Sequence, residues 1–306
     1  MSAVKKVTEK IVSRIGDVLI GKDHEVRLAL ACLFARGHLL IEDLPGMGKT
    51  TLAQTLAKVL GLNYKRIQFT SDMLPADIIG VSVYDRNNGS FEFYPGPVFS
   101  QVVLADEINR TTPKTQSALL EAMSEGQVSI EGETRRLPQP FFVIATQNPV
   151  TQSGTFPLPE SQLDRFLMRI KLGYPDPAAE RLLLSGDDPR NGVKNLKACI
   201  NDKALMQIQV QVSKVQVADS LIDYLQRLLQ QTRSLPELNY GISPRGGMAL
   251  LQSARAWALM DGRQYVIPED VQVCLGPVCG HRLSGTVNNQ EVDSLIQEVL
   301  NTVDII

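Results

Sequence analysis

The segment EDLPGMGKT (residues 42–50) has the residue types and the spacing of a loop that binds phosphate groups. Gly46 and Gly48 allow the backbone to curl so that its N–H groups point towards phosphate oxygens. A helix that follows such a loop adds the positive end of its dipole. Lys49 would then reach the β- and γ-phosphates of a nucleotide, and the Thr50 hydroxyl would bind Mg²⁺.

The loop departs from the strict phosphate-binding pattern at one position. Asp43 stands where the pattern has its first glycine, although the sequence from Pro45 to Thr50 is intact. An ordinary glycine turn followed by an unrelated lysine is the alternative interpretation. The predicted order of strand, loop and helix around the segment favours the phosphate-binding loop.

Two acids end the apolar run VVLA (residues 102–105) and are candidates for catalytic chemistry. Asp106 would hold Mg²⁺ through water, and Glu107 would orient and polarise a water that attacks the terminal phosphate. Acids often end strands, so the pair alone is weak evidence. Its position two strand lengths after the phosphate-binding loop makes it strong, because the carboxyl ends of parallel strands are where open α/β sheets bind ligands.

Three further residues could act on a bound triphosphate, and each has an ordinary alternative. Asn148, in ATQNP (residues 145–149), could hydrogen-bond the attacking water or the γ-phosphate, although Asn-Pro is also a common turn. Arg165 could stabilise transition-state charge on a neighbouring subunit's nucleotide, or form a surface salt bridge with Asp164. Arg245 begins a predicted helix, where the dipole favours acids, so it suggests an anionic partner; a solvated arginine is the alternative.

Alternating strands and helices must position these groups. Five short apolar runs are predicted as strands of a mainly parallel sheet with helices on both faces: His38–Glu42, Tyr64–Phe69, Gln101–Asp106, Phe141–Thr146 and Leu167–Leu172. Helical spacing of apolar residues predicts four helices around them, namely Val4–Ile15, a helix capped by Asp23 that runs to about Arg36, Lys49–Leu60 and Pro113–Glu125.

Two stretches break this alternation and are predicted as β-hairpins. The first turns at Asn87-Asn88-Gly89, with apolar residues alternating on either side. The second turns at Glu131-Gly132. Neither is needed to complete the sheet, and insertions on a rigid scaffold tend to contact another molecule.

After the segment YPDP (residues 174–177) no further strand is predicted. Residues 186–193 are predicted as a loop, and six helices are expected: Ala178–Ser185, Asp202–Val210, Val217–Thr232, Pro244–Met260, Pro268–Leu275 and Glu291–Val303. A chain of 306 residues suggests two domains at roughly 150 residues each. We therefore expect an α/β domain over residues 1–174 and an all-helical domain over residues 175–306.

Composition limits the class of protein further. The 31 Lys and Arg residues against 33 Asp and Glu residues give a net charge of −2, which argues against a nucleic-acid backbone as the main partner. The longest uncharged apolar run, Leu28–Ala35, is far shorter than the ~20 residues that span a bilayer, and the charged N-terminus does not resemble an export signal. Neither membrane insertion nor export is expected, which points to the cytoplasm.

The cysteines are scattered, and free thiols in a reducing cytoplasm are expected for all four: Cys32, Cys199, Cys274 and Cys279. Cys274, Cys279 and His281 could form a metal site, but their spacing fits no zinc template. Cysteines of the apolar core are the favoured interpretation.

Taken in this order, the motifs resemble those of the AAA+ ATPases and, within them, those of the MoxR family. The resemblance extends from Ile20-Gly21-Lys22 to the C-terminal helices. The most specific segment is LADEINRTTPKTQSALLEAMSEGQV (104–128). The others are IEDLPGMGKT (41–50), FTSDMLPADIIG (69–80), FYPGPVF (93–99), ATQNP (145–149), LPESQLDRF (158–166) and SPRGG (243–247).

The resemblance implies a role for each motif. Residues 49 and 50 would be the Walker A pair, residues 106 and 107 the Walker B pair, Asn148 sensor 1, Arg165 the arginine finger and Arg245 sensor 2. Whether Arg245 acts on its own or on a neighbour's nucleotide stays open. Contacts to ATP are expected from Ile20, Gly21, Pro45, Gly46, Met47, Gly48, Lys49, Thr50, Thr51 and Asp106, with Thr50 and Asp106 also serving Mg²⁺.

The resemblance also implies an assembly and a type of work. An arginine finger requires a neighbouring site, so a head-to-tail ring, as a hexamer, is expected. The hairpins resemble the family's helix-2 insert and pre-sensor-1 hairpin, and Arg110 is an interface candidate. The implied function is chaperone-like remodelling, maturation or cofactor insertion of a protein client, with a von Willebrand factor A protein as adaptor.

Two other functions stay open at this point. One is a nucleotide-dependent assembly scaffold with little turnover, against which the complete set of catalytic residues counts. The other is a DNA-translocating motor, which the charge disfavours although Arg135-Arg136 form a small basic feature on the second hairpin.

Overall fold

A five-stranded parallel sheet forms the centre of the molecule, as predicted. The structure is a computed structural model that describes residues 2–148, 155–186, 189–285 and 289–305. The strand order is β2-β5-β8-β1-β9, and every neighbouring pair is parallel. The strands are β1 (Leu39–Glu42), β2 (Tyr64–Gln68), β5 (Val102–Asp106), β8 (Phe142–Gln147) and β9 (Met168–Ile170).

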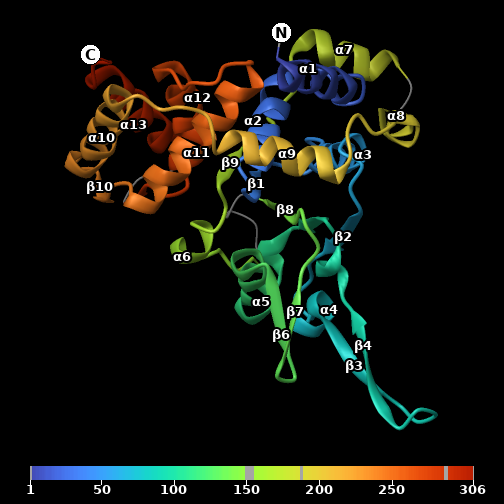
Figure 1. The fold of residues 1–306 in the computed structure, drawn as a ribbon. Coiled ribbons are helices and arrows are strands. Elements are labelled where there is room, and N and C mark those ends of the chain that lie inside the picture. The colour runs from blue at the N-terminus through green and yellow to red at the C-terminus, as the bar shows by residue number, and fades with distance from the viewer. Residues whose placement is uncertain (1, 149–154, 187–188, 286–288, 306) are drawn as a thin grey trace.

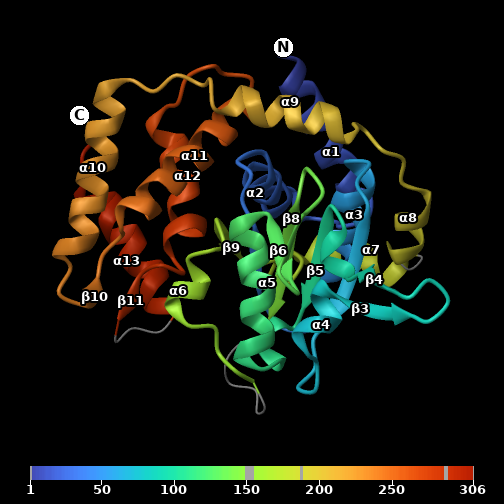
Figure 2. The same ribbon diagram turned by 60° about the horizontal axis from the view of Figure 1, so that its bottom comes forward.

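Alternate residues along the strands enter two separate apolar cores, which places helices on both faces of the sheet (Figures 1 and 2). Leu39 and Ile41 pack with α1 (Ala3–Gly16), α2 (Asp23–Phe34) and α3 (Lys49–Val59). Leu40 packs on the opposite face with α4 and α5, for which the bounds are Pro75–Ile79 and Pro113–Glu125. The strands are buried on both faces, as parallel strands usually are.

The helix boundaries agree with the sequence patterns except in small details. Lys22, not Asp23, occupies the N-cap position of α2; Asp23 is the first helical residue, where its charge still favours the helix dipole. Gly61 follows α3 with a φ of +65°, the left-handed conformation that ends many helices. The short helix α4 was not predicted, because five residues are too few to show helical periodicity.

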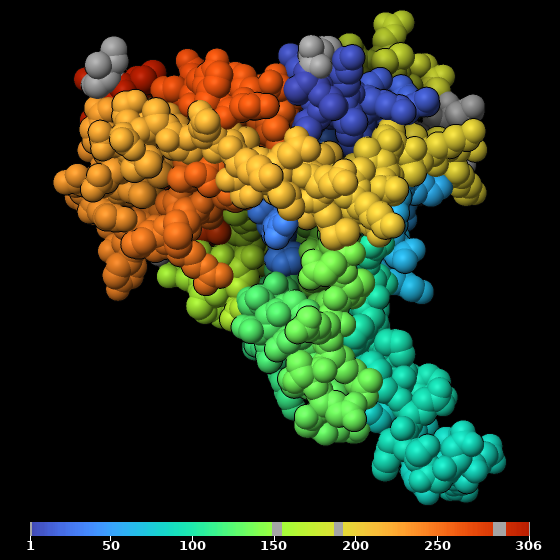
Figure 3. Space-filling model, viewed as in Figure 1, coloured from blue at the N-terminus to red at the C-terminus, as the bar shows by residue number. Residues whose placement is uncertain are grey.

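Both predicted hairpins are present and protrude from the same end of the molecule (Figures 1 and 3). The first pairs β3 (Gly80–Asp85) with β4 (Ser90–Pro95), and the second pairs β6 (Gln127–Ile130) with β7 (Glu133–Arg136). The Arg135 guanidinium of the second hairpin lies 4.1 Å from the ring centre of Phe93 on the first. A cation–π contact therefore joins the two hairpins.

Helices dominate the chain after residue 176, but two predictions for this region are wrong. Part of the predicted loop 186–193 is helical, because α8 spans Pro189–Asn195; residues 187 and 188 lie outside the described part. Strands do not end at residue 174, since β10 (Leu238–Tyr240) and β11 (Ser284–Gly285) form a two-stranded antiparallel sheet. Strands of three and two residues are too short to show an alternating pattern.

The C-terminal helices pack against the N-terminal ones, and α11 contacts both α1 and α2. The bounds are α7 (Pro177–Ser185), α9 (Asp202–Val212), α10 (Asp219–Ser234), α11 (Pro244–Met260), α12 (Pro268–Cys279) and α13 (Asn289–Thr302). Helix α12 continues through Pro277 and ends four residues beyond its predicted end at Leu275. The division into two domains near Tyr174 stays a prediction.

Three of the four cysteines, Cys32, Cys274 and Cys279, are buried in the apolar core as expected. Burial raises the pKa of the Cys279 thiol to about 12. Among the described residues, no group of three His, Cys, Asp or Glu side chains is arranged to hold a metal ion. No helix in that part of the chain is long and apolar enough to cross a membrane.

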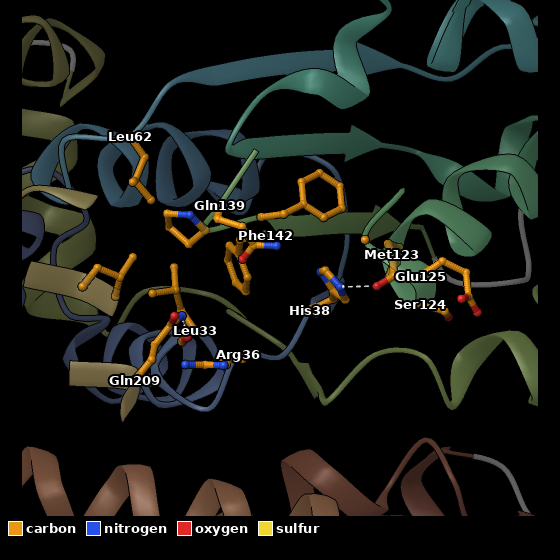
Figure 4. Close-up of a pocket in the computed structure, with 14 residues that line it drawn as sticks. Leu33, Arg36, His38, Leu62, Met123, Ser124, Glu125, Gln139, Phe142 and Gln209 are labelled. Carbon is orange, nitrogen blue, oxygen red and sulfur yellow. Dashed lines mark hydrogen bonds between the residues drawn. The ribbon is translucent and has the colours of Figure 1, made fainter. Parts of the chain in front are cut away.

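His38 joins three elements at the amino ends of the strands, beside a cavity of about 260 Å³ (Figure 4). Its Nδ1 accepts a hydrogen bond of 3.0 Å from the Val143 N–H, so its Nε2 carries the proton and donates to the Met123 carbonyl at 3.1 Å. A proton on Nδ1 would face the N–H of Val143. Burial lowers the pKa of His38 to about 4, and it also lowers the pKa of His281.

The free energy of unfolding should therefore fall as the pH drops from about 6.5 to about 4, because the unfolded chain takes up protons that the folded chain refuses. Urea unfolding at pH 7 and pH 5 measures the effect. We expect His38→Gln to reduce the difference in the free energy of unfolding between pH 7 and pH 5 by about 1–2 kcal/mol. His24→Gln, at an exposed position, should leave this difference unchanged. Equal pH dependence of the unfolding free energy in both variants would contradict the assignment to His38.

Candidate nucleotide site

The predicted phosphate-binding loop connects β1 to α3 at the carboxyl edge of the sheet. Gly46 and Gly48 have φ angles of +89° and +87°, which glycine adopts without strain. Gly48 is also the N-cap of α3 and contributes no side chain to cover the N–H groups of the first turn. The loop thus has the open backbone and the helix start that a phosphate group requires.

Lys49 is held at the bottom of this loop. It is 7 % exposed, and its Nζ donates to the Asp43 carbonyl at 2.6 Å and to Asn148 Oδ1 at 3.0 Å. Burial lowers the pKa of Lys49, while the carboxylates of Asp43, Asp106 and Glu107 act in the opposite direction. The ammonium group therefore has protein acceptors that phosphate oxygens could replace.

Thr146 positions both predicted catalytic acids. Its hydroxyl donates to Asp106 Oδ1 at 2.6 Å and accepts the backbone N–H of Glu107 at 2.9 Å. Glu107 itself has a left-handed backbone, with φ 58° and ψ 50°. That conformation is uncommon for a residue with a side chain, and this bond helps to hold it.

Asn148 joins the acid to the lysine. Its Nδ2 donates to Glu107 Oε1 at 2.9 Å, while its Oδ1 accepts from Lys49. The three groups lie in one cavity of about 310 Å³ with Asp106, and Asn148 is 3 % exposed. The structure thus brings these predicted residues together; Pro149, the last residue of the same motif, lies outside the described residues.

Residues of β2 and of the segment after β5 complete the surroundings of the acids, and no sequence motif had singled out Arg66 or Gln68. Arg66 donates to Asp106 Oδ2 from Nε at 3.0 Å and from Nη2 at 2.6 Å. Gln68 donates to Glu107 Oε2 at 3.1 Å, and Arg110 Nε lies 3.1 Å from the same oxygen. Arg110 is thus an ion-pair partner of Glu107, and its place at a subunit interface stays a prediction.

The donor set suits Mg²⁺. The Thr50 hydroxyl and the Asp106 carboxylate line the same cavity as Lys49, and Mg²⁺ typically takes one or two protein oxygens together with waters and substrate phosphates. The ion would neutralise charge between the phosphate oxygens. Thr146 and Arg66 hold the Asp106 carboxylate in place, so it would face a hydrated ion in a fixed orientation.

A second cavity of about 480 Å³ adjoins the first and shares Gly46, Gly48 and Thr51 with it. Its walls are largely apolar and include Ile20 and Met47, as expected for the base of a nucleotide. All ten predicted contact residues line one of the two cavities except Gly21. Gly21 has a φ of +73°, and a Cβ on it would lie 3.0 Å from Ala179 Cβ; its contact with the nucleotide stays a prediction.

Arg165 and Arg245 are not brought to these cavities. They line a separate cavity of about 240 Å³, together with Arg36 and Arg282. Arg165 donates to the Leu120 carbonyl at 3.3 Å and to the Ser124 hydroxyl. The alternative salt bridge between Arg165 and Asp164 is not formed. Asp164 pairs with Arg245 at 3.5 Å and with Arg282 at 2.8 Å.

Comparison with known proteins shows the fold and the family of the chain. A family model described as "ATPase family associated with various cellular activities (AAA)" matches residues 38–168, and one described as "AAA lid domain" matches residues 230–301. Chaperone MoxR1 of Mycobacterium tuberculosis is 38% identical over 99% of this chain and 83% of its own length. The chain belongs to the MoxR family of AAA+ ATPases.

Two further relatives of this MoxR-family ATPase match it over nearly their whole length. The protein YeaC of Bacillus subtilis is 44% identical over 97% of this chain and 94% of its own. The crystal structure of a proposed ATPase from Cytophaga hutchinsonii superposes with a TM-score of 0.89 at 36% identity, covering 98% of this chain and 95% of that one. The fold and the ATPase family are therefore the ones that the motifs predicted.

The geometry at Thr146 leads to a testable expectation. Thr146→Val keeps the shape of the side chain but removes both hydrogen bonds to the acids, so ATP turnover of this MoxR-family ATPase should fall about 10- to 100-fold. Steady-state hydrolysis measures the effect. Thr55→Val is the matched control and should keep wild-type turnover, because among the described contacts the Thr55 hydroxyl bonds only to carbonyls of its own helix. Wild-type turnover in Thr146→Val would contradict the role of Thr146 in holding the acids.

Proposed function

We propose that this MoxR-family ATPase hydrolyses Mg²⁺-bound ATP at the cavity around Asn148 and does so as a head-to-tail ring. The observation that carries the proposal is the pair of bonds from Asn148 to Lys49 and to Glu107. They place a phosphate-binding cation and a candidate base in one cavity, with an amide between them that can contact both a γ-phosphate and an attacking water.

The residues divide the work of hydrolysis among them. Lys49 would exchange its acceptors for β- and γ-phosphate oxygens. Glu107 would accept a hydrogen bond from the attacking water and polarise it, and Asn148 would fix the direction from which that water approaches. Mg²⁺, held through Thr50 and Asp106, would offset the negative charge of the phosphates.

A second copy of the chain would complete the site. The cavity that holds Arg165 and Arg245 is distinct from the one that holds Lys49 and Glu107. Four arginines but one acid, Asp164, line the first of these cavities, so it suits an anion from outside the chain. A head-to-tail contact between identical chains would bring that cavity to a neighbour's γ-phosphate and would close into a ring, which we propose to be a hexamer.

The work of the ring is proposed from its relatives and its shape. MoxR1 carries the name of a chaperone. The two protruding hairpins offer surfaces that nucleotide-dependent motion of the C-terminal region, residues 175–306, could displace (Figure 3). We therefore propose ATP-driven remodelling, maturation or cofactor insertion of a protein client in the cytoplasm, with a von Willebrand factor A protein as adaptor.

The other two functions are less well supported by the contacts. A scaffold that rarely hydrolyses ATP would not require Glu107 to be held by Thr146, Gln68 and Asn148 together. A DNA motor would use the basic pair on the second hairpin, but Arg135 is partly covered and lies over the ring of Phe93. The net charge of −2 points the same way.

Mixing two inactive variants tests the ring. Glu107→Gln lacks the base of its own site, and Arg165→Ala lacks the finger for its neighbour's site, so each alone should lose ATP turnover about 100-fold. In a random 1:1 mixture, about a quarter of the interfaces would combine an intact site with an intact finger and recover turnover. Steady-state hydrolysis of the mixture measures that recovery.

The matched control is a mixture of Lys49→Ala with Glu107→Gln. Both residues line the same cavity of one chain, so no site in that mixture has both, and no turnover should return. Failure of the first mixture to recover turnover, although its subunits exchange, would show that Arg165 does not act on a neighbour.

A further inference from the structure

Two charged side chains from distant parts of the sequence hold the turn at residues 172–174. Asp43 Oδ2 accepts the backbone N–H groups of Leu172 at 2.8 Å and of Gly173 at 2.6 Å. Lys22 Nζ donates to the carbonyl oxygens of Leu172 and of Tyr174, the latter at 2.8 Å. Asp43 thus binds N–H groups of the turn, and Lys22 binds its carbonyl oxygens.

Asp43 also belongs to the phosphate-binding loop. Its Oδ1 accepts the Leu44 N–H at 2.8 Å, and its carbonyl oxygen accepts from Lys49. The two carboxylate oxygens therefore accept three backbone N–H groups, one from the loop and two from the turn. A glycine, which the strict motif has at this position, could form none of these side-chain bonds.

The turn forms one wall of the apolar cavity next to the phosphate-binding loop. Gly173, Tyr174 and Pro175 line that cavity together with Val18 and Leu19, and none of the three lines the cavity of Lys49 and Glu107. Lys22 lines the apolar cavity as well and is 8 % exposed. The bonds that Asp43 and Lys22 form with the turn therefore act on the part of the site that lies beyond the phosphates.

We propose that Asp43 and Lys22 are positioning residues that fix this wall and thereby set the affinity for the nucleoside part of a nucleotide, separately from the affinity for its phosphates. When the wall is ordered before the ligand binds, the binding free energy does not include the cost of ordering the wall. The inference rests on the proposed function, because it requires that the two cavities hold one nucleotide.

Asp43→Asn tests the inference with almost no change of shape. An amide has one oxygen, so its NH₂ group must face at least one of the backbone N–H groups that the carboxylate accepts. Isothermal titration calorimetry with ADP and with inorganic tripolyphosphate separates the two parts of the site. We expect the dissociation constant for ADP to rise about tenfold and that for tripolyphosphate to change less than about twofold.

Lys22→Met should give the same split, because it removes both bonds to the turn and keeps an apolar stem of similar length. Lys58→Met is the matched control: Lys58 also donates to two carbonyl oxygens, those of Val193 and Lys194, at 2.8 Å and 3.1 Å, but between α3 and α8. Its affinities for both ligands should equal those of the wild type. Should Asp43→Asn fail to fold by circular dichroism, Asp43→Gly restores the residue of the strict motif and should show the same split.

The outcomes are distinguishable. If the affinities of Asp43→Asn for ADP and for tripolyphosphate fall equally, Asp43 acts through the shape of the phosphate-binding loop, and the inference is wrong. Unchanged affinities for both ligands in Asp43→Asn and Lys22→Met would also overturn it. A wild-type chain that binds tripolyphosphate but not ADP would refute the proposed function itself, and the inference with it.

Discussion

The site depends on the two hydrogen bonds of the Asn148 side-chain amide, one with Lys49 and one with Glu107. The three residues follow three different strands. Lys49 follows β1, Glu107 follows β5, and Asn148 follows β8, which lies between them in the sheet. Parallel strands present their carboxyl ends at one edge, so this order alone brings the cation, the amide and the acid together. Each of the three would lose a partner if β8 were shifted, and the whole sheet thus serves to fix one triangle of side chains.

Much of the fold and of this triangle could be predicted from local sequence. The loop at residues 42–50 and the acids at 106 and 107 carry their signals in contiguous residues, and all five strands show as apolar runs. Strand order carries no such signal. Gln68 reaches Glu107 because β2 pairs with β5 in a register that sets Gln68 opposite Asp106. The Thr146 role was hidden for the same reason, although the residue lies within a recognised motif.

Departures from a pattern proved as informative as agreement with it. Asp43 weakened the match to the strict phosphate-binding motif, yet its carboxylate accepts N–H groups from the turn after β9 and so connects two walls of the site. Arg135 suggested a basic surface, but it lies over Phe93 and links the hairpins instead. In both cases the residue type is visible in the sequence but its partner is not, because the partner lies far away along the chain.

The proposed hydrolysis needs residues of one chain and an arginine from a second chain. One chain has both cavities that we propose for the nucleotide, whereas Arg165 and Arg245 line a third cavity. The most direct measurement is ATP turnover per chain and ADP binding per chain across a dilution series from micromolar to nanomolar protein, with assembly followed by sedimentation. We expect turnover per chain to fall as the assembly dissociates, while ADP binding per chain stays constant. Constant turnover per chain at concentrations where the protein sediments as a monomer would contradict this expectation.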